Sequence, residues 1–379
     1  MSSDKLRILT VITSLRMGGA ERLITDMLPR LRERGHEAEL LLFDGTRTPL
    51  YDALERQGVT IHTLGTGAFQ MWNPLHVFSL KRFLKRERYD IVHTHNTSCQ
   101  LLAAMAAGKD APILVTTEHN TFNRRRNWRW YDPIDRRMYG KYSHVFCVGA
   151  ETERNLLLKL GGADGMPSTS VTLNGIDLGR FFNAVPDEGL LEEADKGRHI
   201  VLMVAAFREQ KDHSTLLKAM THLPDDYRLW LVGDWVLRPA REKQAAELGI
   251  RDRVRFWGNR SDVPAIMAMA DVVVLSSHYE GMSLASIEGM ASGKPFIASD
   301  VEGLHDTVGG AGLLFPHEDD GRLAELIRKV CEDKEFAATV TKNCIERAEC
   351  FNIDKTVDAY EQIYYKIEPI SRKNDVNNL

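Results

Sequence analysis

Residues 271–298 contain, in order, the apolar run Asp271-Val-Val-Val-Leu275, the polar stretch His278-Tyr-Glu-Gly-Met-Ser-Leu-Ala-Ser-Ile-Glu288 and the apolar run Gly293-Lys-Pro-Phe-Ile-Ala298. This order predicts a strand, a loop that leads into a helix, and a second strand. Two strands joined through a helix lie parallel in a sheet, and open α/β sheets bind ligands at the carboxyl ends of their strands. The polar stretch is therefore expected at a ligand-binding edge.

The polar stretch has the chemistry of a sugar-nucleotide site. The N–H groups at the start of its helix, around Met282 to Ala285, favour an anion such as a phosphate. The carboxylate of Glu288, about one and a half turns into the helix, can accept hydrogen bonds from vicinal hydroxyls. Phosphate on the amides and a diol on the glutamate describe a sugar nucleotide.

Apolar runs and amphipathic stretches alternate through the first half of the chain. Ala20–Arg34 has apolar residues at helical spacing and ends before Gly35, and Asn73 and Pro74 are expected to open another helix. Seven runs are expected as strands: Leu6–Val11, Glu39–Phe43, Val59–Leu64, Ile91–His95, Ile113–Glu118, His144–Val148 and Val171–Leu173. Alternating strands and helices imply a parallel sheet covered on both faces.

The pattern begins again after a polar stretch, Asn183–Lys196, which is expected to be a linker. The second series of strands comprises His199–Ala206, Leu229–Val232, Val254–Trp257, Val272–Leu275 and Phe296–Ser299. A last helix is expected over Ile353–Glu368. The sequence therefore predicts two Rossmann-like domains with a cleft between them.

Composition and charge narrow the class of protein. Apolar residues make up 43% and charged residues 27% of the 379 residues, as in globular proteins, and no apolar run reaches the ~18 residues of a membrane span. The N-terminus lacks the apolar core of a secretory signal. The five cysteines lack metal-ligand spacing, which favours free thiols in a reducing cytosol. Residues 1–180 carry a net charge of +6 and the remainder −10. Unless this asymmetry is compositional chance, the basic half faces something anionic.

Several motifs, in their order along the chain, resemble those of retaining glycosyltransferases of family 4 (glycosyl transferases group 1). In addition to the stretch between Glu280 and Glu288, they are Met17-Gly18-Gly19-Ala20-Glu21, His93-Thr-His95-Asn96, Glu118-His119-Asn120, Asn174-Gly175-Ile176-Asp177, Arg208-Glu-Gln-Lys211 and Val254-Arg-Phe256-Trp-Gly258. The resemblance spans residues 7 to 355. It implies the α/β GT-B fold, with two Rossmann-like domains, an interdomain cleft and a C-terminal helix that crosses back to the first domain. The expected divisions are an acceptor domain over 1–180, a donor domain over 181–355, and the helix and tail over 356–379.

The second domain contains the expected donor-binding residues. Arg208 and Lys211 follow an apolar strand, where two cations can converge on a diphosphate and stabilise the leaving nucleotide. The family's arginine and lysine pair falls on these residues, and its sugar-binding glutamate falls on Glu280. The remaining expected substrate contacts are Gly281, Met282, Ser283, Leu284 and Glu288, with Trp257 and Gly258 at the nucleobase. Trp257 is equally compatible with a packing role in the domain.

In the first domain, the resemblance implies that Gly18 and Gly19 lie beside the donor diphosphate and that His119 contacts the transferred sugar. The alternatives are a tight turn for the glycines and a structural role for His119. The pair His93 and His95 resembles a metal pair only superficially, and a structural or acceptor-side role is expected. No Asp-x-Asp motif occurs in the chain, so the reaction is expected to need neither a metal nor another cofactor.

Two basic stretches in the first half suggest contact with lipid. One contains Arg124, Arg125, Arg126 and Trp128, and the other is Lys81-Arg-Phe-Leu-Lys-Arg-Glu-Arg88. Arginine beside tryptophan suits an anionic membrane surface or a polyprenyl-diphosphate-linked saccharide acceptor. Solvated helix faces are the alternative. No nucleic-acid motif accompanies the two stretches, so a nucleic-acid partner is not expected.

We therefore expect a retaining hexosyltransferase that uses a nucleoside diphosphate sugar, by resemblance a UDP-sugar, in surface polysaccharide or glycan biosynthesis. Its expected location is the cytoplasm, at the inner face of the cell membrane. Two alternatives remain open. A UDP-sugar 2-epimerase has the same fold and needs no acceptor, and a binding protein of this fold lacks catalysis. The basic first half argues against the epimerase, and the presence of Arg208, Lys211, Glu280 and Glu288 argues against the binding protein.

Overall fold

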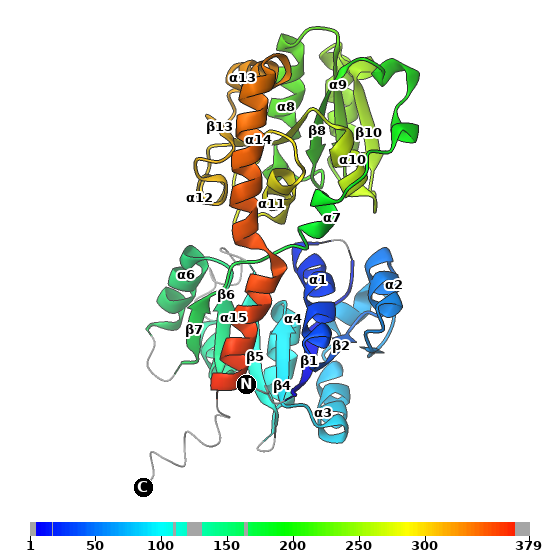
Figure 1. Ribbon diagram of the computed structural model, residues 1–379. Helices are drawn as coiled ribbons and strands as arrows, with labels where there is room; N and C mark the ends of the chain where they lie inside the picture. Colours follow the sequence, from blue (N-terminus) through cyan, green and yellow to red (C-terminus); the bar gives the residue numbers. More distant parts are fainter. Residues whose placement is uncertain (1–4, 17, 109–110, 120–130, 163–165, 368–379) are drawn as a thin grey trace. The chain divides into compact units, whose positions relative to one another are not determined.

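The computed structural model describes residues 5–16, 18–108, 111–119, 131–162 and 166–367. The chain divides into two compact units (Figure 1). The first unit comprises residues 1–175 and 353–379, and the second comprises residues 176–352. Each unit contains one parallel sheet with helices, so the predicted two-domain α/β fold is confirmed.

The first unit is built on a seven-stranded parallel sheet in the order β3-β2-β1-β4-β5-β6-β7. Its strands are β1 Arg7–Ile12, β2 Glu37–Leu42, β3 Ile61–Thr63, β4 Ile91–His95, β5 Ile113–Glu118, β6 His144–Cys147 and β7 Ser168–Val171. Its α-helices are α1 Gly19–Glu33, α2 Pro49–Arg56, α3 His76–Glu87, α4 Thr97–Ala106, α5 Asp132–Tyr139, α6 Ala150–Leu160 and α15 Ile353–Lys366.

Alternation along β1 shows how this sheet is covered on both faces. Ile8 and Ile12 pack in the core that includes α1, α2 and α15, whereas Leu9 and Val11 pack in the core that includes α3, α4, α5 and α6. Successive side chains of a strand point to opposite faces. Burial on both faces therefore requires the nearly continuous apolar run that the sequence shows.

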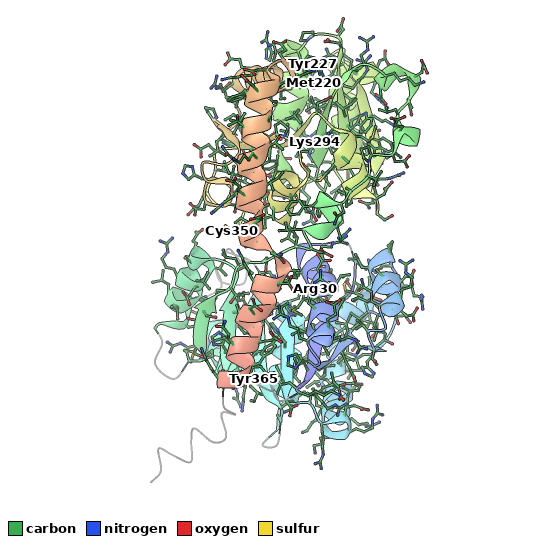
Figure 2. All side chains as sticks on the ribbon, viewed as in Figure 1. Arg30, Met220, Tyr227, Lys294, Cys350 and Tyr365 are labelled. Atoms are coloured by element: carbon green, nitrogen blue, oxygen red, sulfur yellow. The ribbon has the colours of Figure 1, made fainter. Side chains whose placement is uncertain are left out.

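Helix α15 closes the first unit from the far end of the chain. Its Tyr360 ring lies 4.5 Å from the ring of Phe146 on β6. At the exposed side, Arg34 pairs with Asp354 at 3.4 Å and with Asp358 at 2.5 Å. Figure 2 labels Arg30 and Tyr365, which belong to α1 and α15 of this unit. The predicted return of the C-terminal helix to the first domain is confirmed.

The second unit is built on a six-stranded parallel sheet in the order β10-β9-β8-β11-β12-β13. Its strands are β8 His199–Val204, β9 Tyr227–Val232, β10 Val254–Gly258, β11 Val272–Leu275, β12 Phe296–Ser299 and β13 Leu313–Phe315. Its α-helices are α7 Gly179–Phe182, α8 His213–Ala219, α9 Arg238–Glu247, α10 Val263–Met269, α11 Leu284–Ala291, α12 Leu304–Val308, α13 Asp320–Glu332 and α14 Lys334–Ala348.

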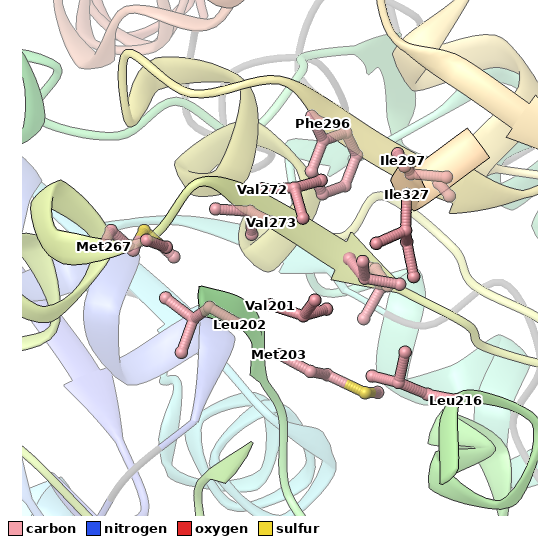
Figure 3. Close-up of a cluster of buried hydrophobic side chains, with 14 of the residues drawn as sticks. Val201, Leu202, Met203, Leu216, Met267, Val272, Val273, Phe296, Ile297 and Ile327 are labelled. Atoms are coloured by element: carbon pink, nitrogen blue, oxygen red, sulfur yellow. The ribbon is translucent and has the colours of Figure 1, made fainter. Parts of the chain in front are cut away.

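The core of the second unit contains side chains from the central strands and the helices that cover them. Figure 3 shows Val201 and Met203 of β8 with Val273 of β11 and Phe296 of β12, all at most 2% exposed. Burying such side chains stabilises a fold by roughly 1.5–3 kcal/mol each. This core holds the central strands rigid, and the site residues lie at the ends of those strands.

Three local expectations from the sequence are wrong. Helix α3 begins at His76, because Asn73 makes a turn in which its side-chain oxygen accepts from the Leu75 N–H at 3.0 Å. Strand β7 ends at Val171 rather than beginning there. The stretch expected as a polar linker contains two short 3-10 turns, and its buried Asp195 accepts from Arg255 of β10 at 3.3 Å. Asp195 therefore ties this stretch to the second sheet, although most of its other polar residues are exposed.

Both sheets have the strand order 3-2-1-4-5-6 when their strands are numbered from the start of each sheet, and the first sheet adds one more strand. The order reverses between β1 and β4 in the first unit and between β8 and β11 in the second. In open α/β sheets, ligands bind outside the carboxyl ends of the strands at such a reversal. These two edges are where each unit's site residues are expected.

Candidate active site

The reversal between β8 and β11 brings together residues 69 positions apart in the sequence. The Lys211 ammonium, in the turn after β8, pairs with the Glu280 carboxylate in the loop after β11. Their side chains are 16% and 6% exposed. The same carboxylate accepts from the Ser277 hydroxyl at 2.6 Å and from the Gln210 amide at 3.3 Å.

This arrangement fixes the lysine in place. An ion pair with little exposure is held by its extra hydrogen bonds, because a buried charge is costly unless it is paired. A carboxylate offers about four acceptor positions. Lys211, Ser277 and Gln210 occupy three positions on Glu280, which leaves room for one further donor such as a sugar hydroxyl.

Arg208 lies three residues before Lys211, at the end of the same strand. Its guanidinium lies over the Trp235 ring, 4.5 Å from the ring centroid. Trp235 follows β9 and is 54% exposed, so this pair lies at the rim of the sheet edge. A cation over an aromatic face is held without being neutralised. Arg208 therefore keeps its charge available for an anion.

Helix α11 presents its N-terminus to the same edge. Ser283, the residue before the helix, is buried, and its side chain makes no capping hydrogen bond. The first N–H groups of a helix have no partner within the helix, and they favour an anion. Gly281, Met282 and Glu288 are half-buried around this helix start, and Leu284 is buried.

In the first unit, the loop after β1 leads through Gly18 into α1. A side chain on Gly18 would place its first carbon 2.3 Å from a carboxylate oxygen of Glu21, so the flexible Glu21 side chain would have to move to admit it. Gly18 and Gly19 are both exposed. Burial raises the pKa of Glu21 above its ordinary value, and a hydrogen bond from Asn96 opposes that rise.

His119, after β5, is one end of a row of histidines. Its Nε2 lies 2.9 Å from Nδ1 of His95, at the end of β4, and the His95 ring stacks on His93 with centroids 4.3 Å apart. His93 contacts the Tyr364 hydroxyl of α15 at 2.6 Å and the Thr117 hydroxyl at 2.7 Å. The row therefore ties His119 to the core of the first unit.

The histidines of this row are neutral at pH 7. Burial lowers the pKa of His119 to about 4, and the nearby Glu118 carboxylate opposes that change only in part. Burial also holds the pKa values of His93 and His95 well below the ordinary value. A neutral imidazole has one donor and one acceptor nitrogen. The His95 contact therefore leaves Nδ1 of His119 to meet a ligand.

Comparison with known proteins identifies the family. Residues 192–347 match the family described as glycosyl transferases group 1, and residues 17–180 match the family described as glycosyltransferase family 4. A mannosyltransferase of Mycolicibacterium hassiacum, described as MMP alpha-(1->4)-mannosyltransferase, is 31% identical over 283 residues, which are 68% of this chain and 67% of that protein. This chain belongs to the group 1 glycosyltransferases.

A second relative and a solved structure agree with the assignment. The UDP-Gal:alpha-D-GlcNAc-diphosphoundecaprenol alpha-1,3-galactosyltransferase of Escherichia coli is 28% identical over 316 residues, covering 76% of this chain and 78% of that protein. The structure of Anabaena HepE in complex with UDP-glucose superimposes with a TM-score of 0.79 at 21% identity, over 94% of this chain and 99% of that one. At that identity the structural likeness supports the GT-B fold.

Trp257 has a different environment from the one expected of a base-stacking residue in this glycosyltransferase. The Arg255 guanidinium lies 3.7 Å from the centroid of its ring, and the ring of Trp230 meets it edge-on at 5.2 Å. These contacts favour the packing role that the sequence left open. Gly258 lies at the sheet edge, where its carbonyl accepts from the Gly233 N–H at 2.8 Å.

Within the described residues of this glycosyltransferase, one group offers three metal ligands close together: His278, His317 and Glu318. Nδ1 of His278 and Nε2 of His317 lie 2.7 Å apart. Their ring nitrogens are therefore within hydrogen-bond distance of one another.

The membrane patch that the sequence predicts lies outside the described residues. It comprises Arg124, Arg125, Arg126 and Trp128.

Sequence reasoning missed several residues that shape the site of this glycosyltransferase. Ser277 and Gln210 hold Glu280, and both lie within or next to the stretches that the motifs marked. Gly303, after β12, has φ +83°, and a side chain there would come within 2.3 Å of the Glu280 carbonyl oxygen. Only glycine allows that loop to pack on the site loop. Its neighbours in the sequence carry no signal of this contact.

Proposed function

We propose that this glycosyltransferase moves a hexose from a UDP-sugar to a saccharide or a polyprenyl-diphosphate-linked saccharide, with retention of the anomeric configuration and without a metal. The observation that carries the proposal is the cationic edge of the second unit. Arg208 and Lys211 lie at the strand reversal beside the N-terminus of α11. This combination suits a diphosphate between two cations and a helix start.

The proposed roles follow from these positions. Lys211 and Arg208 stabilise the negative charge that develops on the diphosphate as the sugar leaves, which is where preorganised charges lower a barrier most. Glu280 holds Lys211 and accepts from a hydroxyl of the sugar. Glu288, in the second turn of α11, accepts from the ribose hydroxyls. His119, neutral and held by His95, contacts the transferred sugar.

UDP is proposed as the nucleotide because of two named proteins. The E. coli relative uses UDP-galactose by its name, and Anabaena HepE has been solved with UDP and with UDP-glucose. A thermal-shift panel of UDP-, GDP- and ADP-sugars tests this choice, since a ligand that binds only the folded state raises its stability. A larger shift with a GDP- or ADP-sugar would replace UDP in the proposal.

A lipid-linked acceptor is proposed because the E. coli relative acts, by its name, on a diphosphoundecaprenol-linked sugar. None of the described helices has both the length and the hydrophobicity to cross a bilayer. We propose the inner, cytoplasmic face of the cell membrane as the place of reaction.

Metal independence is proposed because Arg208, Lys211 and the start of α11 supply positive charge without an Asp-x-Asp motif. Retention is proposed from the family's Glu280–Glu288 segment. One experiment tests both points: NMR of the product made from a UDP-sugar and a GlcNAc-diphosphate-lipid, with and without EDTA. Loss of activity that Mg²⁺ restores would contradict metal independence, and an inverted anomer would contradict retention. Sugar release without any acceptor would favour the epimerase.

A further inference from the structure

Four large apolar side chains lie exposed within ten residues of the first unit. Phe69 is 76% exposed, Trp72 70%, Leu75 65% and Phe78 70%. They belong to a 3-10 turn, Ala68–Trp72, and to the start of α3. Single exposed apolar residues are ordinary, but a contiguous patch marks an interaction site. We call residues 69–86 the aromatic–basic segment.

Helix α3 separates this patch cleanly from its buried face. His76, Leu80 and Leu84 are buried at four-residue spacing, and they face the core that α3 shares with α4. Leu75, Phe78, Arg82 and Lys85 follow one another at steps of three, four and three residues. At about 3.6 residues per turn, they form one stripe on the opposite side of the helix. The stripe is apolar at its first end and cationic at its second.

The cationic end carries charge that the described part of the chain does not neutralise. Lys81, Arg82, Lys85 and Arg86 are all exposed. Among the described residues, Arg86 pairs with Glu87 at 2.7 Å, and no ion pair joins Lys81, Arg82 or Lys85 to a carboxylate. A helix face with aromatic and basic residues side by side suits the boundary between lipid headgroups and acyl chains.

The aromatic–basic segment begins at the edge of the first sheet where its site residues lie. The segment follows β3, and helix α3 (light blue in Figure 1) runs from it back toward the start of β4. The Gly67 N–H donates to Asp44 at 2.8 Å, and Asp44 pairs with Arg16 at 3.1 Å. Arg16 belongs to the loop that leads to Gly18. The segment is therefore tied to the glycine loop.

We propose that the aromatic–basic segment is the surface through which the protein docks on an anionic lipid bilayer. Phe69, Trp72, Leu75 and Phe78 enter the headgroup region, and Lys81, Arg82, Lys85 and Arg86 pair with anionic headgroups. The charge complementarity selects a bilayer over an apolar partner. The inference rests on the proposed function for its purpose, because docking here holds the first unit at the membrane surface that carries a lipid-linked acceptor.

Co-sedimentation tests the proposal, with vesicles of phosphatidylglycerol and phosphatidylcholine against vesicles of phosphatidylcholine alone. An apolar variant replaces Phe69, Trp72, Leu75 and Phe78 with Ser, and a charge variant replaces Lys81, Arg82, Lys85 and Arg86 with Gln. Wild type is expected to bind only the anionic vesicles at low salt, and each variant to bind at least about tenfold more weakly. Added salt should weaken binding, because it screens surface charge.

Two controls show whether position matters: one replaces two exposed apolar side chains, and the other replaces four exposed cations. Met105→Ser with Leu158→Ser removes exposed apolar side chains elsewhere on the first unit. A second control variant removes four exposed cations, the same number as the charge variant, by replacing Arg56, Arg137, Lys141 and Lys355 with Gln. Both controls are expected to bind as wild type does. Trp72→Phe should reduce the blue shift of tryptophan fluorescence that anionic vesicles cause, which locates the contact at this residue.

Three results would overturn the proposal: wild type that ignores anionic vesicles at low salt, a variant of the segment that still binds like wild type, or controls that lose binding equally. A different outcome would assign the surface to a second copy of the chain: wild type binds no vesicles but forms a dimer, and the apolar variant is monomeric. A UDP thermal shift measured on every variant separates the two questions. A normal shift with unchanged vesicle binding refutes the docking surface alone, whereas no shift in wild type refutes the UDP donor.

Discussion

The two units have the same strand order, yet their site edges carry opposite kinds of chemistry. At the edge of the second sheet, Lys211 and Glu280 pair with little exposure and Arg208 lies over Trp235. At the edge of the first sheet, His119 and His95 are neutral and lie 2.9 Å apart, and the loop after β1 contains two glycines. Topology places a site, and the residues at the strand ends decide what it binds.

The difference fits the roles that the proposed function gives to each unit. A leaving nucleotide diphosphate gains charge in the transition state, so its site needs fixed cations. A neutral sugar needs hydrogen bonds whose donors and acceptors do not change with pH near neutrality. In the proposed function, the row that holds His119 would supply such bonds, because its imidazoles stay unprotonated near neutral pH.

The largest expected effect lies at the charged edge. Arg208→Ala and Lys211→Ala should each lower turnover by about 10²-fold or more, the scale for removing one preorganised charge. Lys211→Ala also leaves the Glu280 carboxylate without its cation, so donor binding should weaken with turnover. Steady-state kinetics with a UDP-sugar measures both.

Lys243→Ala is the matched control, because this lysine is 78% exposed on α9 and pairs only with Glu247, one turn along the helix, among the described residues. It should leave turnover unchanged. Near-normal rates in Arg208→Ala or Lys211→Ala, with folding intact by circular dichroism, would mean that the diphosphate is stabilised elsewhere.

The neutral edge should respond less and in a different parameter. His95→Leu removes the partner of His119 Nε2, and kcat should fall about tenfold with little change in KM, the size of one lost hydrogen bond. His95→Asn should restore most of the rate, because its amide lies where Nδ1 of the histidine was. A Leu variant as active as wild type, or an Asn variant as poor as Leu, would contradict a positioning role for His95.

Much of the fold was predictable from the sequence because burial on both faces demands long apolar runs. The predicted strand Leu6–Val11 and the observed strand β1 differ by one residue at each end. The return of the last helix to the first unit was also predicted. The start of α3 was not. Asn73 and Pro74 are typical of a helix start, but the Asn73 side chain makes a turn before His76, and such a choice depends on the local packing.

The sequence could name candidate site residues but not the contacts among them. Motifs named Lys211 and Glu280, yet nothing in the sequence indicated that the two side chains pair with each other. The sequence marked the basic stretch that begins at Lys81, but composition does not distinguish an exposed aromatic residue from a buried one. Pairing and exposure depend on which elements the sheet order brings together, and a single sequence shows this order only indirectly.

A binding experiment compares two glutamates at the charged edge. Glu288→Gln should weaken UDP about tenfold, because a charged acceptor makes a hydrogen bond roughly twice as strong as a neutral one. Glu280→Gln should act mainly on turnover, because it loosens Lys211. Isothermal titration with UDP and kinetics with the UDP-sugar separate the two. Unchanged affinity in Glu288→Gln would remove this residue from the ribose contact.

The smallest effect is expected when only the pH changes. Because burial lowers the pKa of His119 to about 4, its charge should not change between pH 6 and 8. The pH profile of turnover should therefore have the same shape in wild type and in His119→Asn over this range.

The free energy of unfolding should depend on pH in a different way. The unfolded chain binds protons at its histidines below pH 6.5, whereas the half-buried His119 and the buried His144 bind them only near pH 4. The stability that these residues contribute is therefore complete above pH 6.5 and is lost as the pH falls toward 4. Thermal unfolding at pH 7.5, 6.5, 5.5 and 4.5 measures this loss.

His305 is the control. Its hydrogen bond with Asp300 raises its pKa, so protonation of His305 stabilises the folded state. His305→Asn should steepen the acid loss slightly. An unfolding temperature that does not fall below pH 6.5 would show that the row is not buried neutral, and the contrast between the two edges would then lose its basis.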